Sequence, residues 1–170
     1  MSNNAYLETT YDKFIFRVAR GYYYSRMDIW VKLEDGTALL GVSDFLQRRS
    51  GDAAFVEPVV AGTQLQPGDE FAHLETIKAD IVLASPVRGT VVATNDELLS
   101  RPELVNEDPY GAGWIVRVQL TDWAADQANL LDAAAYFPLM QARIEDEAPS
   151  RPPFREVRRD GASDEGRKLR

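Results

Sequence analysis

The stretch "EFAHLETIKADIVLASPVRGT" (Glu70–Thr90) predicts a β-hairpin with a lysine at its tip. Two runs rich in apolar and β-branched residues, Phe71–Ile77 and Ile81–Val87, flank Lys78 and are typical of strands. No Gly, Asn or Pro stands beside Lys78, although hairpin turns usually recruit those residues because they adopt positive φ or preset φ. The presence of a long, flexible amine at this turn therefore needs an explanation.

Short strand-like segments with regular turns surround this hairpin, and "EDGTALLGV" predicts a second one with Asp35-Gly36 as its turn. A short helix is expected at 43–52, begun by Ser43 or Asp44 and ended by Gly51. Many short strands with turn punctuation favour a small barrel or sandwich. Further strands are expected at 14–18, 22–33, 53–60, 89–95 and 113–120, and helical segments at 96–105 and 129–147, the last kinked or divided by Pro138.

Composition limits the classes of function. The chain has 170 residues, 45% of them hydrophobic, and a net charge of −8, which argues for one globular domain and against a nucleic-acid partner. The absence of cysteine excludes thiol catalysis, disulfides and Cys-ligated zinc, and the single histidine, His73, excludes a His-rich metal site. Without a membrane-length apolar run or an N-terminal signal core, we expect a cytoplasmic protein that does not enter a membrane.

The ends of the chain differ from its body. We expect a loose N-terminus over residues 1–12, a folded domain over 13–148 and a basic, disordered tail over 149–170. From Ser150 onward the sequence has seven Arg and Lys residues against four Asp and Glu residues. Such a tail is solvated, or it folds back on the acidic body or contacts a partner.

Three interpretations of Lys78 follow from the residues alone. It is an ordinary solvated surface lysine, a catalytic amine, or a covalent attachment point held where a modifying enzyme reaches it. A catalytic amine needs burial or a cationic neighbour to lower its pKa, whereas Glu75 and Asp80 flank this turn. From the residues alone the solvated surface lysine is the favoured interpretation, and the catalytic one is disfavoured.

The sequence around Lys78 resembles the lipoyl-lysine hairpin of the glycine cleavage system H proteins. The motif "ETIKA", then Ser85-Pro86 and Gly89, matches that family's pattern without gaps. "EDGTALLGVSDFLQRRSGDAAFVE", "ELVNEDPYGAGWIVRV" and "LLDAAAYFPLM" resemble further family blocks in the same order, over about Tyr24–Met140.

The resemblance implies a mainly β fold with short helices, a flattened β-barrel of the lipoyl/biotinyl type (a barrel-sandwich hybrid) followed by a C-terminal helix. It implies lipoic acid linked covalently to Lys78 and a role for Glu75 in recognition by the lipoate-attaching enzyme. The expected partners are that enzyme, dihydrolipoyl dehydrogenase, and either glycine decarboxylase with aminomethyltransferase or a heterodisulfide-reductase-like complex. Such a protein is a carrier with a swinging arm and is not itself an enzyme.

Three departures from the family pattern bear on what the arm carries. The family's N-terminal signature is replaced by "YSRMDIW", which retains Trp30. In the family, polar side chains at the positions of Met27, Ile29 and Val82 line the pocket that holds the loaded arm. An aminomethyl group is a cation, and an apolar pocket offers it no acceptor.

These changes favour the lipoate-binding branch of the heterodisulfide-reductase-like sulfur oxidation pathway, which resembles H proteins. The alternative is a standard glycine cleavage H protein in which the three changes are neutral. A second alternative is an unmodified scaffold, or a protein that relays lipoyl groups to others.

Overall fold

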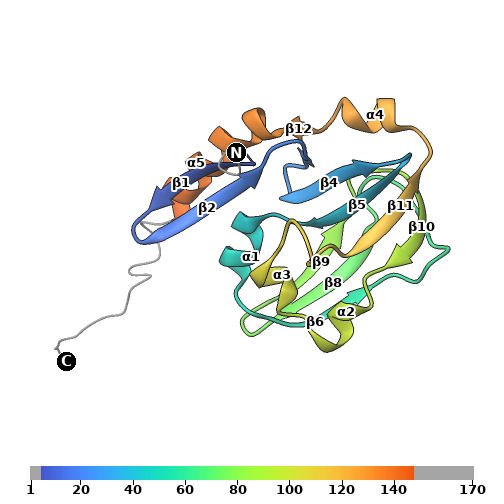
Figure 1. The fold of residues 1–170 in the computed structure, drawn as a ribbon, viewed down its shortest axis with the longest axis horizontal. Coiled ribbons are helices and arrows are strands. Elements are labelled where there is room, and N and C mark those ends of the chain that lie inside the picture. The colour runs from blue at the N-terminus through green and yellow to red at the C-terminus, as the bar shows by residue number, and fades with distance from the viewer. Residues whose placement is uncertain (1–4, 148–170) are drawn as a thin grey trace. The chain divides into compact units, whose positions relative to one another are not determined.

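The computed structural model describes residues 5–147, and it is mainly β with short helices, as the sequence predicts (Figure 1). The described residues divide into two compact units, one that ends at Tyr136 and one that begins at Phe137. The strands are β1 (Tyr6–Tyr11), β2 (Phe14–Ala19), β3 (Tyr23–Tyr24), β4 (Ile29–Glu34), β5 (Thr37–Val42), β6 (Ala53–Pro58), β7 (Gln64–Leu65), β8 (Glu70–Thr76), β9 (Asp80–Ala84), β10 (Gly89–Thr94), β11 (Val116–Leu120) and β12 (Leu131–Asp132). The helices are α1 (Asp44–Ser50), α2 (Glu97–Ser100), α3 (Leu104–Glu107), α4 (Trp123–Gln127) and α5 (Ala133–Glu147).

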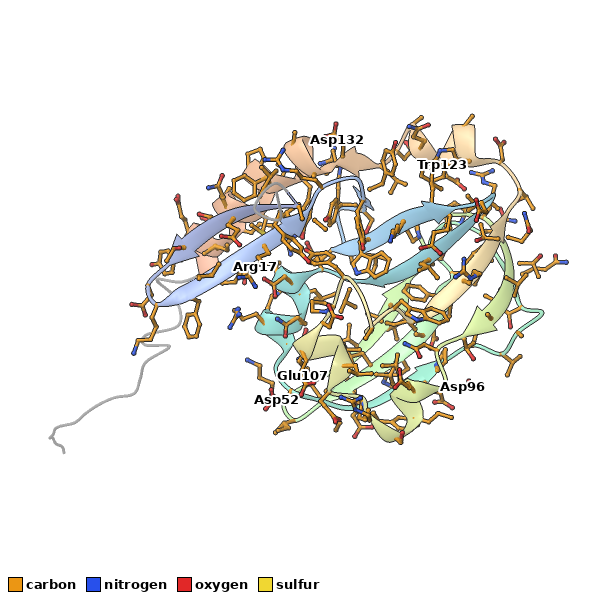
Figure 2. All side chains as sticks on the ribbon, viewed as in Figure 1. Arg17, Asp52, Asp96, Glu107, Trp123 and Asp132 are labelled. Atoms are coloured by element: carbon orange, nitrogen blue, oxygen red, sulfur yellow. The ribbon has the colours of Figure 1, made fainter. Side chains whose placement is uncertain are left out.

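Two antiparallel sheets enclose the core of the first unit. One has seven strands in the order β12-β3-β4-β5-β11-β10-β7, and the other has three in the order β6-β8-β9. Leu40 and Val116 from the larger sheet belong to the same buried cluster as Leu74 and Leu83 from the smaller one. Side chains fill the space between the sheets (Figure 2). The result is a sandwich-like barrel of two open sheets, and β1 and β2 form a third, two-stranded sheet among the described strands.

Local sequence signals explain several connections. β4 and β5 pair through Glu34 and Thr37, and the intervening Asp35 and Gly36 both have positive φ, as the Asp-Gly turn predicts. The hydroxyl of Ser43 accepts a hydrogen bond from the Leu46 amide and begins α1. Gly51 ends this helix with φ of 92°.

The structure differs from the sequence prediction at several elements. The N-terminus is not loose throughout 1–12, because Tyr6–Tyr11 form β1 and pair in register with β2. The strand predicted at 22–33 is interrupted, since a turn ending at Asp28 (φ of 71°) separates β3 from β4. The helix predicted at 96–105 consists of α2 and α3, and the sequence did not indicate α4. Pro138 lies inside α5 and does not divide it.

The basic tail predicted at 149–170 lies outside the described residues, so its disorder stays a prediction. None of the helices described within residues 5–147 has the length and apolarity to cross a membrane.

Candidate functional site: the Lys78 hairpin

Lys78 lies in a two-residue loop at the end of the β8–β9 hairpin. Glu75 and Asp80 form the last registered pair of the ladder. The Thr76 amide then donates to the Ala79 carbonyl at 2.8 Å, which leaves Ile77 and Lys78 as the loop. Both loop residues are exposed.

The tip is closed by the side chain of Thr76. Its hydroxyl oxygen accepts a hydrogen bond from the Ala79 amide at 3.0 Å and donates to the Ala79 carbonyl at 3.3 Å. Neither Ile77 nor Lys78 is among the described residues with positive φ. The hairpin therefore turns without Gly or Asn, because a buried threonine hydroxyl supplies the hydrogen bonds that hold the chain ends together.

The end of α1 supports the tip from outside the hairpin. The Ile77 amide donates to the Asp52 carbonyl at 3.2 Å. The stem of Lys78 lies over Gly51, where an added Cβ would stand 3.3 Å from the Lys78 Cε atom. Within the described residues the Lys78 ammonium has neither an ion pair nor a hydrogen bond. The stem of Lys78 therefore lies next to Gly51, and its amine has no partner in the part of the chain that the structure describes.

Glu75, the residue predicted to contact the modifying enzyme, is exposed next to this tip. It pairs across the sheet with Asp80 on one side and with Phe55 on the other. Phe55 is 44% exposed, so a partly exposed apolar ring lies opposite Glu75. The placement gives an enzyme access to Glu75, and the recognition role stays a prediction.

The three residues predicted to line the arm pocket have different environments. Ile29 is 1% exposed and belongs to the hydrophobic core. Met27 and Val82 are 69% and 61% exposed, and they lie on the turn before β4 and on β9 respectively. The exposed fractions of these three residues do not show that they line one cavity, so the arm pocket stays a prediction.

Asp28 has a structural role that the sequence did not reveal. It is 2% exposed, has positive φ, which Asp tolerates better than most residues, and accepts a hydrogen bond from the Tyr136 hydroxyl at 2.7 Å. Tyr136 stacks on Tyr24 with ring centroids 4.4 Å apart. Burial and the nearby Asp28 charge raise the pKa of Tyr136, which keeps the phenol a hydrogen-bond donor.

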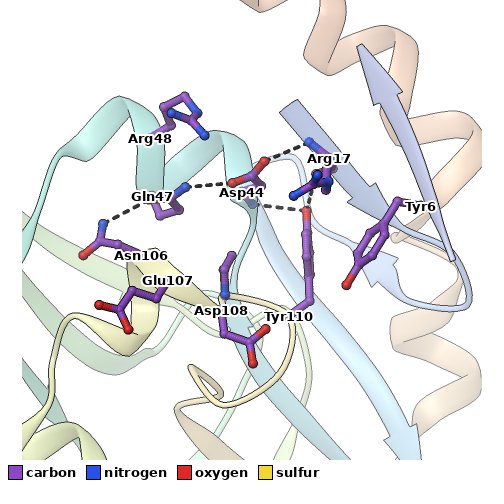
Figure 3. Close-up of a pocket in the computed structure, with 10 residues that line it drawn as sticks. Tyr6, Arg17, Asp44, Gln47, Arg48, Asn106, Glu107, Asp108 and Tyr110 are labelled. Atoms are coloured by element: carbon purple, nitrogen blue, oxygen red, sulfur yellow. Dashed lines mark hydrogen bonds between the residues drawn. The ribbon is translucent and has the colours of Figure 1, made fainter. Parts of the chain in front are cut away.

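A polar cavity of about 200 Å³ opens between β2, α1 and the loop after α3 (Figure 3). Asp44 lies in its wall and accepts from the Arg17 amide at 2.8 Å and from the Gln47 amide group at 2.7 Å. The Tyr110 hydroxyl accepts from the Asp44 amide and donates to the Arg17 carbonyl. These hydrogen bonds join β2, α1 and Tyr110 within the wall. None of the predicted pocket residues lines this cavity.

Sequence reasoning missed three residues that build the tip. Thr76 was treated as an ordinary strand residue, and Gly51 only as the end of a helix. Asn106 lies in the family block "ELVNEDPYGAGWIVRV", and nothing in that block indicates that its side chain hydrogen-bonds residues around Gly51. The family block "ETIKA" includes Thr76, but no local pattern connects Asn106 with a segment so distant in the sequence. Among residues 5–147, no group of three His, Asp or Glu side chains is placed to hold a metal ion.

The fold and this tip define a small β-sandwich domain that presents one lysine on an exposed hairpin. The sequence model of the family "Glycine cleavage H-protein" matches residues 22–143. The chain belongs to the glycine cleavage H-protein family.

Individual relatives agree with this assignment. A glycine cleavage system H protein of Aeromonas salmonicida is 45% identical over 66% of this chain and 88% of its own length. One from Halorhodospira halophila is 43% identical over 69% and 90%. A crystal structure of a glycine cleavage system H protein from Mycobacterium marinum superposes with a TM-score of 0.64, covering 72% of this chain and 98% of that one. Its sequence identity is 24%, so this likeness supports the fold alone.

Proposed function

We propose that this protein is the lipoyl carrier of a glycine cleavage system, with lipoic acid joined through an amide bond to Lys78. The observation that carries the proposal is the Lys78 amine, which is exposed and has no partner within residues 5–147, on a two-residue loop in a chain of the H-protein family.

The residues at the tip fit this modification. Amide formation removes the positive charge of Lys78, and no described carboxylate loses an ion pair as a result. The stem lies next to Gly51, so a longer side chain would extend from beside the end of α1. When bound, lipoic acid supplies the redox-active sulfurs that a chain without cysteine lacks.

The protein acts as a carrier and its partners perform the chemistry. An arm tethered to the carrier meets each partner at a high effective concentration, so the carrier needs only to hold and present it. The partners are glycine decarboxylase, aminomethyltransferase and dihydrolipoyl dehydrogenase, together with the lipoate-attaching enzyme, for which Glu75 offers an exposed contact.

The cargo is the aminomethyl group of glycine cleavage. The relatives named above support this alternative over the sulfur-oxidation hypothesis. That hypothesis rested on an apolar pocket of Met27, Ile29 and Val82. Ile29 instead packs in the core against β5, where an apolar side chain stabilises the fold whatever the arm carries.

A loading assay tests the cargo. Lipoylated protein is mixed with glycine and glycine decarboxylase, and the mass of the aminomethylated protein is followed with time. We expect loading to the extent shown by an H protein of known activity, and none in Lys78→Arg. Lipoylated protein that stays unloaded would contradict the glycine cleavage assignment and restore the sulfur-oxidation alternative.

A further inference from the structure

Asn106, on α3, joins this short helix to the segment that follows α1. Its side-chain amide donates to the Gln47 Oε1 atom and to the Gly51 carbonyl, both at 3.0 Å. Its side-chain oxygen accepts from the Ala53 amide at 2.8 Å. Both donor hydrogens and the acceptor of this amide group are therefore used, and all three bonds end on residues 47–53.

The segment that Asn106 holds is the segment that supports the lysine. Gly51 lies beneath the Lys78 stem, and the Asp52 carbonyl accepts the Ile77 amide. Asn106 binds the residues on both sides of Asp52, through the Gly51 carbonyl and the Ala53 amide. A shift of this segment would therefore remove a hydrogen bond from the hairpin tip and change the surface under the lysine.

Asn106 is itself held by a second set of hydrogen bonds, which leads away through Gln47. Its partner Gln47 is 7% exposed and donates to Asp44, which is 8% exposed and accepts the Arg17 amide (Figure 3). A buried, fully hydrogen-bonded polar network favours one arrangement of its members. The support under Lys78 is thus anchored to β2 through a continuous series of hydrogen bonds.

We propose that Asn106 is a positioning residue for the Lys78 hairpin. It acts through residues 51–53, and in that position it determines how the lysine is presented to the lipoate-attaching enzyme. The consequence for the arm rests on the proposed function, whereas the effect on the hairpin tip does not.

The chain contains a matched control for this proposal. Asn95 is also a hydrogen-bonded asparagine, donating to the Ala112 and Trp114 carbonyls at 2.8 and 2.7 Å and accepting from the Glu97 amide. It holds the loop before β11 and makes no hydrogen bond to residues 47–53. Replacing either asparagine removes comparable bonds, but only one of the two contacts the support under Lys78.

The first measurement is amide hydrogen exchange at Ile77 in the unlipoylated full chain. In Asn106→Ala we expect exchange at Ile77 to accelerate at least about fivefold more than at the neighbouring Leu74 amide, as loss of a supporting hydrogen bond implies. Asn106→Asp retains an acceptor for the Ala53 amide but loses both donors, so it tests the Gly51 bond if the alanine variant folds poorly. Asn95→Ala should lower global stability without a selective change at Ile77.

The second measurement is the rate of lipoylation of the same variants by a lipoate-attaching enzyme. For Asn106→Ala we expect a KM for the carrier raised about fivefold or more with kcat nearly unchanged, since the amine is intact but less well placed. Equal exchange at Ile77 in the Asn106 and Asn95 variants would overturn the proposal. Faster Ile77 exchange in a chain that accepts no lipoyl group would uphold the positioning of the tip and overturn the proposed function instead.

Discussion

Two hairpins of this domain turn in two residues by different means. The β4–β5 hairpin uses Asp35 and Gly36, both with positive φ, and its tip is encoded by those two residues. The β8–β9 hairpin uses Ile77 and Lys78, neither with positive φ, and depends on the Thr76 hydroxyl and the Asp52 carbonyl.

The difference shows what an attachment lysine requires of its turn. An Asp-Gly turn restricts both loop residues to types that tolerate positive φ. At the lysine tip, hydrogen bonds from Thr76 and to the Asp52 carbonyl hold the turn, so the loop residues need no positive φ and a lysine is accepted there. The cost is dependence on contacts between segments distant in the sequence. Substitutions in those distant segments should therefore change the lysine hairpin and leave the Asp-Gly hairpin unaffected.

The largest expected effect is a loss of stability when a core leucine of either hairpin is shortened. Leu40 on β5 and Leu74 on β8 are 0% and 1% exposed in the same core. Leu40→Ala and Leu74→Ala should each lower the free energy of unfolding by about 2–5 kcal/mol, measured by urea denaturation. A loss below about 1 kcal/mol for either variant would show that one hairpin does not belong to the common core.

A smaller effect is expected at the Asp-Gly turn, where a substitution should lower the free energy of unfolding without changing lipoylation. Gly36 has φ of 80° and open space around its α-carbon, so Gly36→Ala tests only the cost of positive φ. We expect a loss of about 1–2 kcal/mol in the free energy of unfolding. The rate of lipoylation at Lys78 should not change, and a slower rate would contradict the independence of the two tips.

At the lysine tip, by contrast, we expect a substitution to slow lipoylation at only a small cost in the free energy of unfolding. Thr76→Val keeps the shape of the side chain but removes the hydroxyl that binds Ala79, at a cost of about 0.5–1.5 kcal/mol. Lipoylation should slow although Lys78 is untouched. Thr76→Ser restores the hydroxyl and should restore the rate; if valine and serine behave alike, the hydrogen bond does not hold the tip.

The smallest effect at neutral pH concerns a cluster of tyrosines that belongs to neither turn. Burial raises the pKa of Tyr22 to about 12, and burial also raises the pKa values of Tyr24, Tyr110 and Tyr136. A phenol whose pKa is higher in the folded protein contributes stability that is fully present below its unfolded pKa of about 10. Stability should be insensitive to tyrosine ionisation near pH 7 and fall as the pH rises from about 10 toward 12.

This alkaline loss is measured by urea denaturation at a series of pH values. Tyr22→Phe removes one of the contributing phenols and should make the fall between about pH 10 and 12 shallower. An unchanged slope would show that Tyr22 does not contribute to the loss.

The sequence predicts what depends on local signals. Asp35-Gly36, the Ser43 cap and the helix end at Gly51 were each readable because a few adjacent residues determine the backbone there. The lysine tip was located by its motif, but its support was not predicted, because Asn106 and Asp52 reach it from other elements. β1 was missed for a similar reason: its pairing with β2 is not evident from a polar N-terminal sequence.

The three apolar positions that differ from the family pattern were also hard to interpret, because the sequence does not show how deeply each side chain is buried. Sequence reasoning assigned Met27, Ile29 and Val82 to one pocket, whereas burial distinguishes a core residue from two exposed ones. Asp28 lies in the altered signature "YSRMDIW", and in the structure it occupies a turn with positive φ and accepts a hydrogen bond from Tyr136.

The most direct test of the account is the mass of the full chain produced with lipoate and a lipoate-attaching enzyme, followed by mapping of the modified peptide. We predict one lipoyl group per chain, attached to Lys78, and an unmodified mass for Lys78→Arg under the same conditions. A lipoyl group on another lysine, or one retained in Lys78→Arg, would contradict the assignment of the β8–β9 tip as the attachment site.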